Sequence, residues 1–135
     1  MPLNPKLSNV GANAAADAVC VQANNGYLRI YDGTQPTDAD TAIGAQVLLA
    51  ELRFGATAFG AAAAGVATAN ALTADASANA TGTASWFRVL ASNGTTTLWD
   101  GSVGTATSNL ILNSVAISSG AAVSVSAFTY TQAKT

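Results

Sequence analysis

The chain has 135 residues, a formal net charge of −2, one cysteine and no histidine. This length suits a single domain, and the lone cysteine excludes an internal disulfide. The small net charge and the five scattered basic residues predict no contact with nucleic acid.

Charged side chains are scarce along the whole chain. They make up 9% of the residues, against about 25% in a typical soluble domain. A surface of Ala, Gly, Ser, Thr and Asn has few charges that repel a neighbour and few long side chains to immobilise on contact. The composition therefore favours a subunit that packs against other copies or a partner. Compositional drift toward Ala and Gly codons is the alternative explanation.

The N-terminal part of the chain predicts an arm followed by a helix. Residues 1–9 contain Pro2 and Pro5 and are expected to be extended. Residues 12–25 form the one helix candidate because they are rich in alanine, and an Asn-Asn-Gly sequence supplies a stop. Ala15, Val19 and Ala23 would give this helix a narrow apolar stripe.

From residue 27 onward the apolar residues recur with a period close to two, which is typical of strands. Asn93-Gly94 lies between two of these segments and predicts a type I′ hairpin turn. Regular spacing and turn residues predict a mainly β fold, a single antiparallel β-sandwich or barrel of about seven strands over residues 27–132. The predicted strands are residues 27–32, 46–54, 65–72, 84–92, 96–103, 108–117 and 121–132.

No segment predicts membrane insertion or export. Asn9, Asn13 and Asp17 interrupt any signal-like apolar run near the N-terminus. Residues 55–74 are mostly Ala, Gly and Thr, which is too weakly apolar for a transmembrane helix. We expect a soluble protein made in the cytoplasm, with no membrane partner.

The residue types needed for common catalytic sites are missing or poorly placed. Without histidine the chain lacks the commonest general base and the usual partner of a serine or cysteine nucleophile. Cys20 lies between two valines in the predicted helix, a setting that favours a buried structural thiol over a reactive one. We therefore expect no enzyme and no cofactor.

The segment DGTQPTDAD holds Asp32, Asp38 and Asp40, the candidate metal ligands of the chain. Carboxylate oxygens suit calcium, but Pro36 interrupts the segment and its spacing matches no known calcium loop. Asp-Gly and Gln-Pro-Thr-Asp are also ordinary turn sequences. A solvated turn is the main interpretation, and an ion-binding or contact loop is the alternative.

Aromatic residues offer a second possible binding surface. A sugar-binding platform and a packed core or interface are both compatible with aromatic side chains spread over several strands. The scattered positions favour the core or interface. The residues concerned are Tyr27, Tyr31, Trp86, Trp99 and Tyr130.

Three passages carry a resemblance to a known group of proteins: LRIYDGTQPTDADTAIG…LLAELRFGATAFGAAAAGVATAN, ATGTASWFRVLASNGTTTLWDGSVG and LILNSVAISSGAAVSVSAFTYT. They resemble small virion proteins of tailed bacteriophages that are rich in Ala, Gly and Thr. The resemblance spans residues 27–131 and rests on texture and short phrases, not on catalytic residues. It implies a structural virion component, assembled in the bacterial cytoplasm.

Among virion roles we favour a capsid decoration, or cement, protein that bridges major capsid subunits as a dimer or trimer on the capsid surface. A short, charge-poor β domain behind an extended arm suits this role, because an arm can add to a neighbour's surface. The expected contact residues are Pro2, Leu3, Pro5 and Lys6 of the arm with Asp32, Asp38 and Asp40. The loop of residues 73–84 is a further expected contact.

Two other functions stay open. A tail-tube or head–tail connector subunit is the alternative within virions, although the hairpin around Asn93 is short for a tube. A carbohydrate-binding adhesive module, using Trp86 or Trp99 with the acidic segment, is the alternative from another class.

Overall fold

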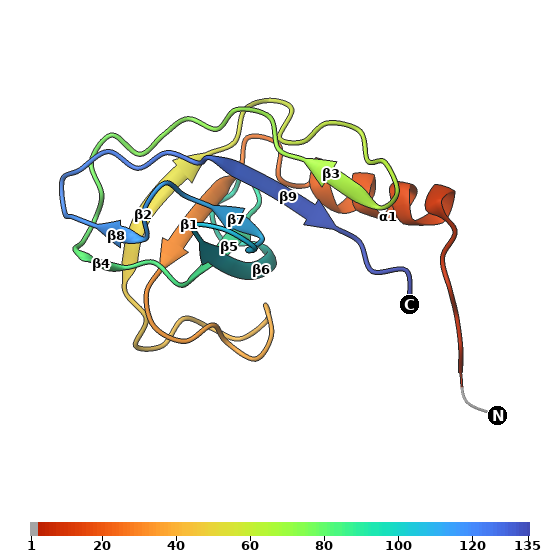
Figure 1. The fold of residues 1–135 in the computed structure, drawn as a ribbon, viewed down its shortest axis with the longest axis horizontal. Helices are drawn as coiled ribbons and strands as arrows, with labels where there is room; N and C mark the ends of the chain where they lie inside the picture. The colour runs from red at the N-terminus through yellow and green to blue at the C-terminus, as the bar shows by residue number, and fades with distance from the viewer. Residues whose placement is uncertain (1–2) are drawn as a thin grey trace.

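The computed structural model describes residues 3–135 and is mainly β with one helix (Figure 1). Its elements are α1 (Asn9–Val21), β1 (Tyr27–Tyr31), β2 (Leu48–Arg53), β3 (Val66–Thr68), β4 (Gly82–Thr83), β5 (Trp86–Leu90), β6 (Thr97–Gly104), β7 (Leu110–Ile111), β8 (Ala116–Ile117) and β9 (Ala127–Thr131).

Seven strands form one sheet in the order β2-β1-β5-β6-β7-β9-β3, and β4 pairs with β8 in a small second sheet. The prediction of a purely antiparallel arrangement is wrong, because β6 and β7 run parallel. Parallel neighbours usually need a long crossover, but here the pairing covers only two residues of each strand. A short connection that bends at Thr107, with a φ of 43°, therefore suffices. The edge strands β2 and β3 do not pair, so the sheet is not closed into a barrel.

The free edge of β2 is nonetheless covered by the segment that follows β3. Arg53 and Thr73 exchange backbone hydrogen bonds of 3.2 and 2.9 Å. The Asp75 carboxylate accepts a bond of 2.9 Å from the backbone N–H of Glu51. Exposed strand edges invite pairing with other chains, so these contacts reduce that tendency at β2.

Helix α1 begins at Asn9, three residues before the predicted start at residue 12. Ser8 is the cause, since its side-chain oxygen accepts a bond of 3.1 Å from the N–H of Gly11 and so caps the helix. The chain leaves the helix through turns that end at Asn25, which has a φ of 58°. The predicted stripe is displaced within the helix, because Ala12, Ala16 and Cys20 face the interior instead of Ala15 and Val19. Ala23, which follows the helix, is buried as predicted.

Three polar side chains of α1 and the turn after it hold the neighbouring segment 58–65. Asn13, Asp17 and Asn24 accept the backbone N–H groups of Gly65, Ala62 and Ala58, each at 2.8 Å. This segment has little secondary structure of its own, so these bonds satisfy backbone groups that would otherwise need water.

The core lies between the helix and the inner face of the sheet, and an aromatic cluster fills its centre. Phe128 of β9 packs edge-on against Phe87 of β5 and Phe59, with ring centroids 5.0 and 5.4 Å away. On β1 the alternation is as predicted, because Leu28 and Ile30 are fully buried on this inner face.

Other predicted strands have shorter or different bounds. Residues 108–117 form two short strands, β7 and β8, instead of one, and only Ala127–Thr131 of residues 121–132 is a strand. The prediction of a type I′ turn at Asn93-Gly94 is wrong. Such a turn needs a positive φ at both residues, and of the two only Gly94 has one, of 73°. Ala91 instead donates to the carbonyl of Thr96 at 2.9 Å, which closes a longer turn.

Candidate interaction surface

The acidic segment follows β1 and forms an exposed loop that returns to β2. Its first residue, Asp32, is half-buried and acts as an anchor. The carboxylate of Asp32 accepts a bond of 2.6 Å from the N–H of Val47, while its own N–H donates to the Val47 carbonyl at 3.1 Å. The two ends of the loop are therefore tied together.

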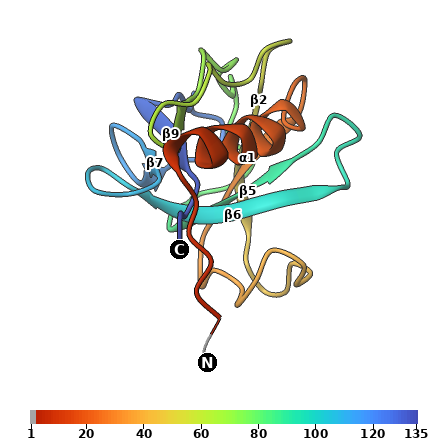
Figure 2. The same cartoon turned by 90° about the vertical axis from the view of Figure 1, so that its right-hand side faces the viewer.

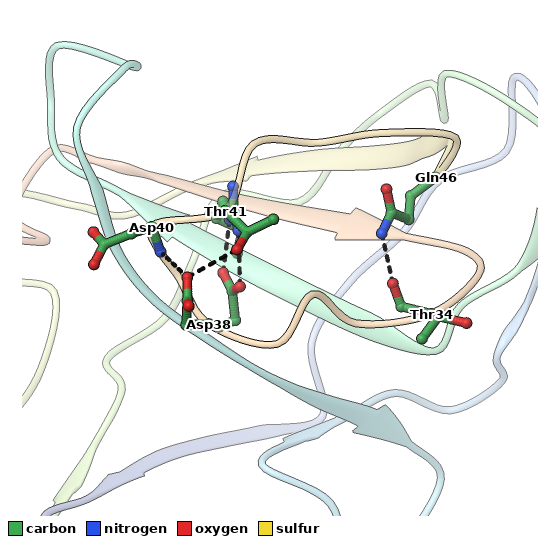
Figure 3. A network of polar contacts seen from close by, with 7 residues as sticks. Thr34, Asp38, Asp40, Thr41 and Gln46 are labelled. Carbon is green, nitrogen blue, oxygen red and sulfur yellow. Dashed lines mark hydrogen bonds and ion pairs between the residues drawn. The ribbon is translucent and has the colours of Figure 1, made fainter.

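Asp38 and Asp40 lie at the exposed tip of this loop. One oxygen of Asp38 accepts bonds from the N–H of Asp40 at 3.1 Å and from the Thr41 hydroxyl at 2.9 Å. Figure 3 shows that the carboxylate of Asp40 points away from Asp38. On the other side of the loop, Gln46 donates to the carbonyl of Thr34 at 2.6 Å. The loop is held by its own turn contacts.

These contacts bear on the metal-ligand hypothesis. Asp38 uses one oxygen within the turn, Asp40 faces elsewhere, and Asp32 is engaged by Val47. Within residues 3–135, no three His, Cys, Asp or Glu side chains gather as a metal site would require. The geometry supports the turn interpretation of the acidic segment.

The base of the loop covers the outer face of the sheet where β1 and β5 meet. Tyr31 and Trp86 stack there, with ring centroids 4.7 Å apart and planes 15° from parallel. The indole N–H of Trp86 donates to the carbonyl of Asp32 at 3.0 Å. Since Trp86 is 0% exposed, it offers no surface for stacking a sugar.

Next to this stack, four charged residues form a row across four strands. The register places Glu51 on β2 opposite Arg29 on β1, Arg29 opposite Arg88 on β5, and Arg88 opposite Asp100 on β6. The acids occupy the two ends of the row and the arginines lie side by side in the middle. Like charges directly opposite one another on neighbouring strands repel, so each arginine depends on its own carboxylate.

The two ion pairs of the row differ in burial. Arg88 and Asp100 form a bidentate pair of 2.7 and 2.9 Å, and their side chains are only 6% and 4% exposed. The hydrogen bonds that Asp100 accepts from Arg88 raise the pKa of Arg88 above its usual value, against an opposing effect of burial. Arg29 binds Glu51 through one contact of 2.7 Å, with side chains 28% and 33% exposed.

An open groove of about 550 Å³ lies above the arginine pair. Its floor contains Arg29, Tyr31 and Arg88. One wall is the tip of the acidic loop, residues 39–43, and the other is the β5–β6 turn, residues 94–97. A groove of this volume is within the usual range for ligand sites.

The N-terminal arm leaves the body of the protein ahead of α1. Leu3 is 96% exposed, and Pro5 and Lys6 are exposed as well. The arm is fastened at its base, where the N–H of Leu7 donates to the carbonyl of Lys134 at 2.8 Å. The arm and the acidic loop both project downward in Figures 1 and 2, but at separate places, since Figure 1 shows the arm at the right and the loop at the left. Pro2 lies outside the described residues.

The remaining predicted contact residues lie closer to the body. Residues 73–84 run between β2 and residues 115–123 instead of projecting, since Thr73 pairs with Arg53, Asp75 pairs with Val123 and Ala78 is buried. Trp99 is half-buried against Phe59 and Tyr130, at centroid distances of 5.8 and 4.9 Å. These aromatic residues serve the core.

The sequence did not predict the charge row or the groove above it. The signal was the placement of Arg29, Glu51 and Arg88 at alternating positions of apolar strands, where a charge needs a partner. Their common row depends on the strand register, which the sequence does not display.

Comparisons of the chain with protein-family models, with curated proteins and with solved structures find no match. Within residues 3–135 there is no helix with the length and apolar character that crossing a bilayer requires.

Proposed function

We propose that the chain is a structural subunit of a bacteriophage virion, a sandwich-like capsid decoration protein that bridges major capsid subunits. The observation that supports this proposal is the exposed arm around Leu3, which projects from the same lower side of the molecule as the acidic loop in Figures 1 and 2. The two segments together suit contact with a neighbouring surface.

The exposed area supports this proposal. The chain exposes 7050 Å², whereas a compact monomer of its mass exposes about 6,500 Å². Projecting segments account for such an excess, and Leu3, Val10 and Val21 add exposed apolar groups at 96%, 80% and 53%. A surface with few charges and protruding apolar side chains gains more from association than a highly charged one.

The proposed mechanism is the burial of surface in many weak contacts, which are repeated in every copy of the subunit in the shell. Each contact alone is modest, but several contacts on one subunit multiply their effect through effective concentration. Arm residues Leu3, Pro5 and Lys6 are proposed to touch capsid protein, with Asp38 and Asp40 as a second contact. Dimers or trimers would place several such arms on one site.

A co-sedimentation experiment tests this function. Virions assembled without the chain are mixed with the purified protein, with a variant lacking residues 2–7, and with the control Thr105→Ala. Thr105 is an exposed residue directly after β6, outside the arm and the acidic loop. Ser8 stays in the deletion variant, so the helix cap is kept. We expect the full chain and the control to pellet with the particles and the deletion variant to stay in solution. Equal binding of the deletion variant would remove the arm from the mechanism, and no binding of the full chain would refute the function.

A further inference from the structure

The groove above the central arginine pair has donors that no acceptor in residues 3–135 uses. Arg29 binds Glu51 through its Nε alone, and Arg88 binds Asp100 through Nε and Nη2. Among residues 3–135, the two Nη atoms of Arg29 and the Nη1 atom of Arg88 donate to no protein acceptor. Arginine presents its donors as a planar fork that matches a carboxylate.

Both guanidinium groups are held in place before any ligand arrives. Arg88 lies over the ring of Trp86 at 5.5 Å and Arg29 over that of Tyr27 at 5.6 Å, in addition to their ion pairs. Fixed side chains lose little conformational freedom when a ligand binds, which favours binding. Arg29, at 28% exposed, is the accessible member, and the nearly buried Arg88 supports it from behind.

We propose that this groove binds an acidic peptide segment of a partner protein, with one side-chain carboxylate held by Arg29. A carboxylate placed there would relieve the repulsion between the two arginines, which face each other across β1 and β5. Threonine hydroxyls on both walls, from Thr41, Thr95 and Thr96, are available for the peptide backbone.

The local charge favours a carboxylate over a phosphate. Glu51, Asp100, Asp38 and Asp40 lie around the two arginines, so these six residues together carry two negative charges. A phosphate with nearly two negative charges would be repelled more strongly than a carboxylate with one. The inference extends the proposed function by naming the chemistry of a partner contact, and it rests on that function only for the origin of the partner.

Fluorescence polarisation tests the groove without any virion. The probe is a labelled peptide with one glutamate flanked by glycine and serine, compared with its glutamine and phosphoserine counterparts. The protein variants are Arg29→Gln, Ile43→Asp, Asp40→Asn and the control Arg53→Gln. Arg53 is an exposed arginine of the same sheet whose guanidinium lies over Tyr27 at 3.9 Å, and it does not line the groove.

We expect the glutamate peptide to bind the unaltered chain more tightly than either counterpart does. Arg29→Gln should weaken this binding by about tenfold or more, whereas Arg53→Gln should leave it nearly unchanged. Ile43→Asp places a negative charge on the wall without touching the ion pairs, so it should also weaken binding, and Asp40→Asn should strengthen it.

Several outcomes would overturn the inference. Equal losses for Arg29→Gln and Arg53→Gln would mean that the peptide senses only overall charge. Tighter binding of the phosphoserine peptide would refute the carboxylate assignment. Equal binding of the glutamate and glutamine peptides, or no binding at all, would refute the site. Such a failure leaves the co-sedimentation test of the arm intact, so the two proposals fail independently.

Discussion

Arg88 and Asp100 lie directly opposite one another on β5 and β6 and form a bidentate ion pair that is almost completely buried. Removal of one partner leaves the other charge uncompensated in the protein interior. Arg88→Met is therefore expected to lower the free energy of unfolding by about 3–5 kcal/mol. Urea-induced unfolding followed by tryptophan fluorescence measures this loss.

The double variant Arg88→Met/Asp100→Leu serves as the decisive comparison. It removes both charges, so its stability should exceed that of either single variant. Arg29→Gln, in the half-exposed pair with Glu51, should cost less than about 1 kcal/mol. If the double variant lost as much free energy of unfolding as the two single variants together, the two residues would not depend on each other as an ion pair.

Cys20 predicts a pH dependence of stability. Burial, with a smaller effect of Asp17, raises the pKa of its thiol from 9.0 to about 11. The unfolded chain therefore loses this proton at lower pH than the folded chain does. The stabilisation is complete below pH 9 and falls as the pH rises toward 11, by roughly 2–3 kcal/mol in total. Urea unfolding at pH 8, 9 and 10 measures the decline.

Cys20→Ala is the control for this pH dependence. Burial also raises the pKa of Tyr130 above its usual 10.0, so a further decline above pH 10 is expected in both proteins. The diagnostic range is pH 9–10, where the variant should show a flatter profile. The same slope in both proteins would contradict the assignment to Cys20.

The polar residues of the helical segment predict a set of stability losses. Asn13→Ala, Asp17→Ala and Asn24→Ala each leave one backbone N–H of residues 58–65 without its acceptor, at a cost of about 1 kcal/mol. Asn13→Ala and Asn24→Ala should cost more than Asp17→Ala, because the bonds of Asn13 and Asn24 are partly buried and that of Asp17 is exposed. Thermal unfolding measures the changes. Gln22→Ala, at an exposed position beside the helix, should change stability by less than about 0.5 kcal/mol.

Gly101 on β6 allows close packing of an aromatic ring. A methyl group at this position would lie within 2.5 Å of the Phe87 ring, so Phe87 would have to move within the aromatic cluster. Gly101→Ala is expected to cost about 1–3 kcal/mol and to alter the near-ultraviolet circular dichroism. Gly55→Ala is the matched control, since nothing lies within 4 Å of an added methyl group there. Equal stability of the two variants would contradict the packing described for Phe87.

Residue types and the period of the apolar residues predict where the strands lie better than they predict which strands pair. Alternation identified β1, β2 and β5 because each has an apolar face of at least two large residues, such as Leu28 and Ile30. It failed for residues 108–117, where Leu110 and Ile117 are both buried but belong to different sheets. Local pattern does not reveal which distant strand completes a sheet.

The register of the β5–β6 hairpin shows the same limit. A two-residue turn at Asn93-Gly94 would pair Arg88 with Trp99. The longer turn keeps Leu90 opposite Thr97, and a bulge at Leu98 then shifts the register so that Arg88 meets Asp100. Bulges depend on packing around the strand more than on the turn sequence. For this reason the ion pair and the groove above it were not predictable.

The acidic segment was predictable in part. Asp-Gly and Thr-Asp sequences indicated a turn, and the bonds that Asp38 accepts from Asp40 and Thr41 are of that kind. Asp32 instead accepts a bond from the distant Val47, which the turn sequence did not indicate. Its position over the outer face of β1 and β5 depends on the contact between Trp86 and Asp32, which joins residues far apart in the chain.

We propose that the chain acts by occupying the surface of a phage head. Immunogold labelling of intact virions, with an antibody against the purified chain, tests this proposal. We predict regular labelling of the capsid, and loss of this label from particles made with the variant lacking residues 2–7. Labelling confined to the tail, or virions without any label, would contradict the claim.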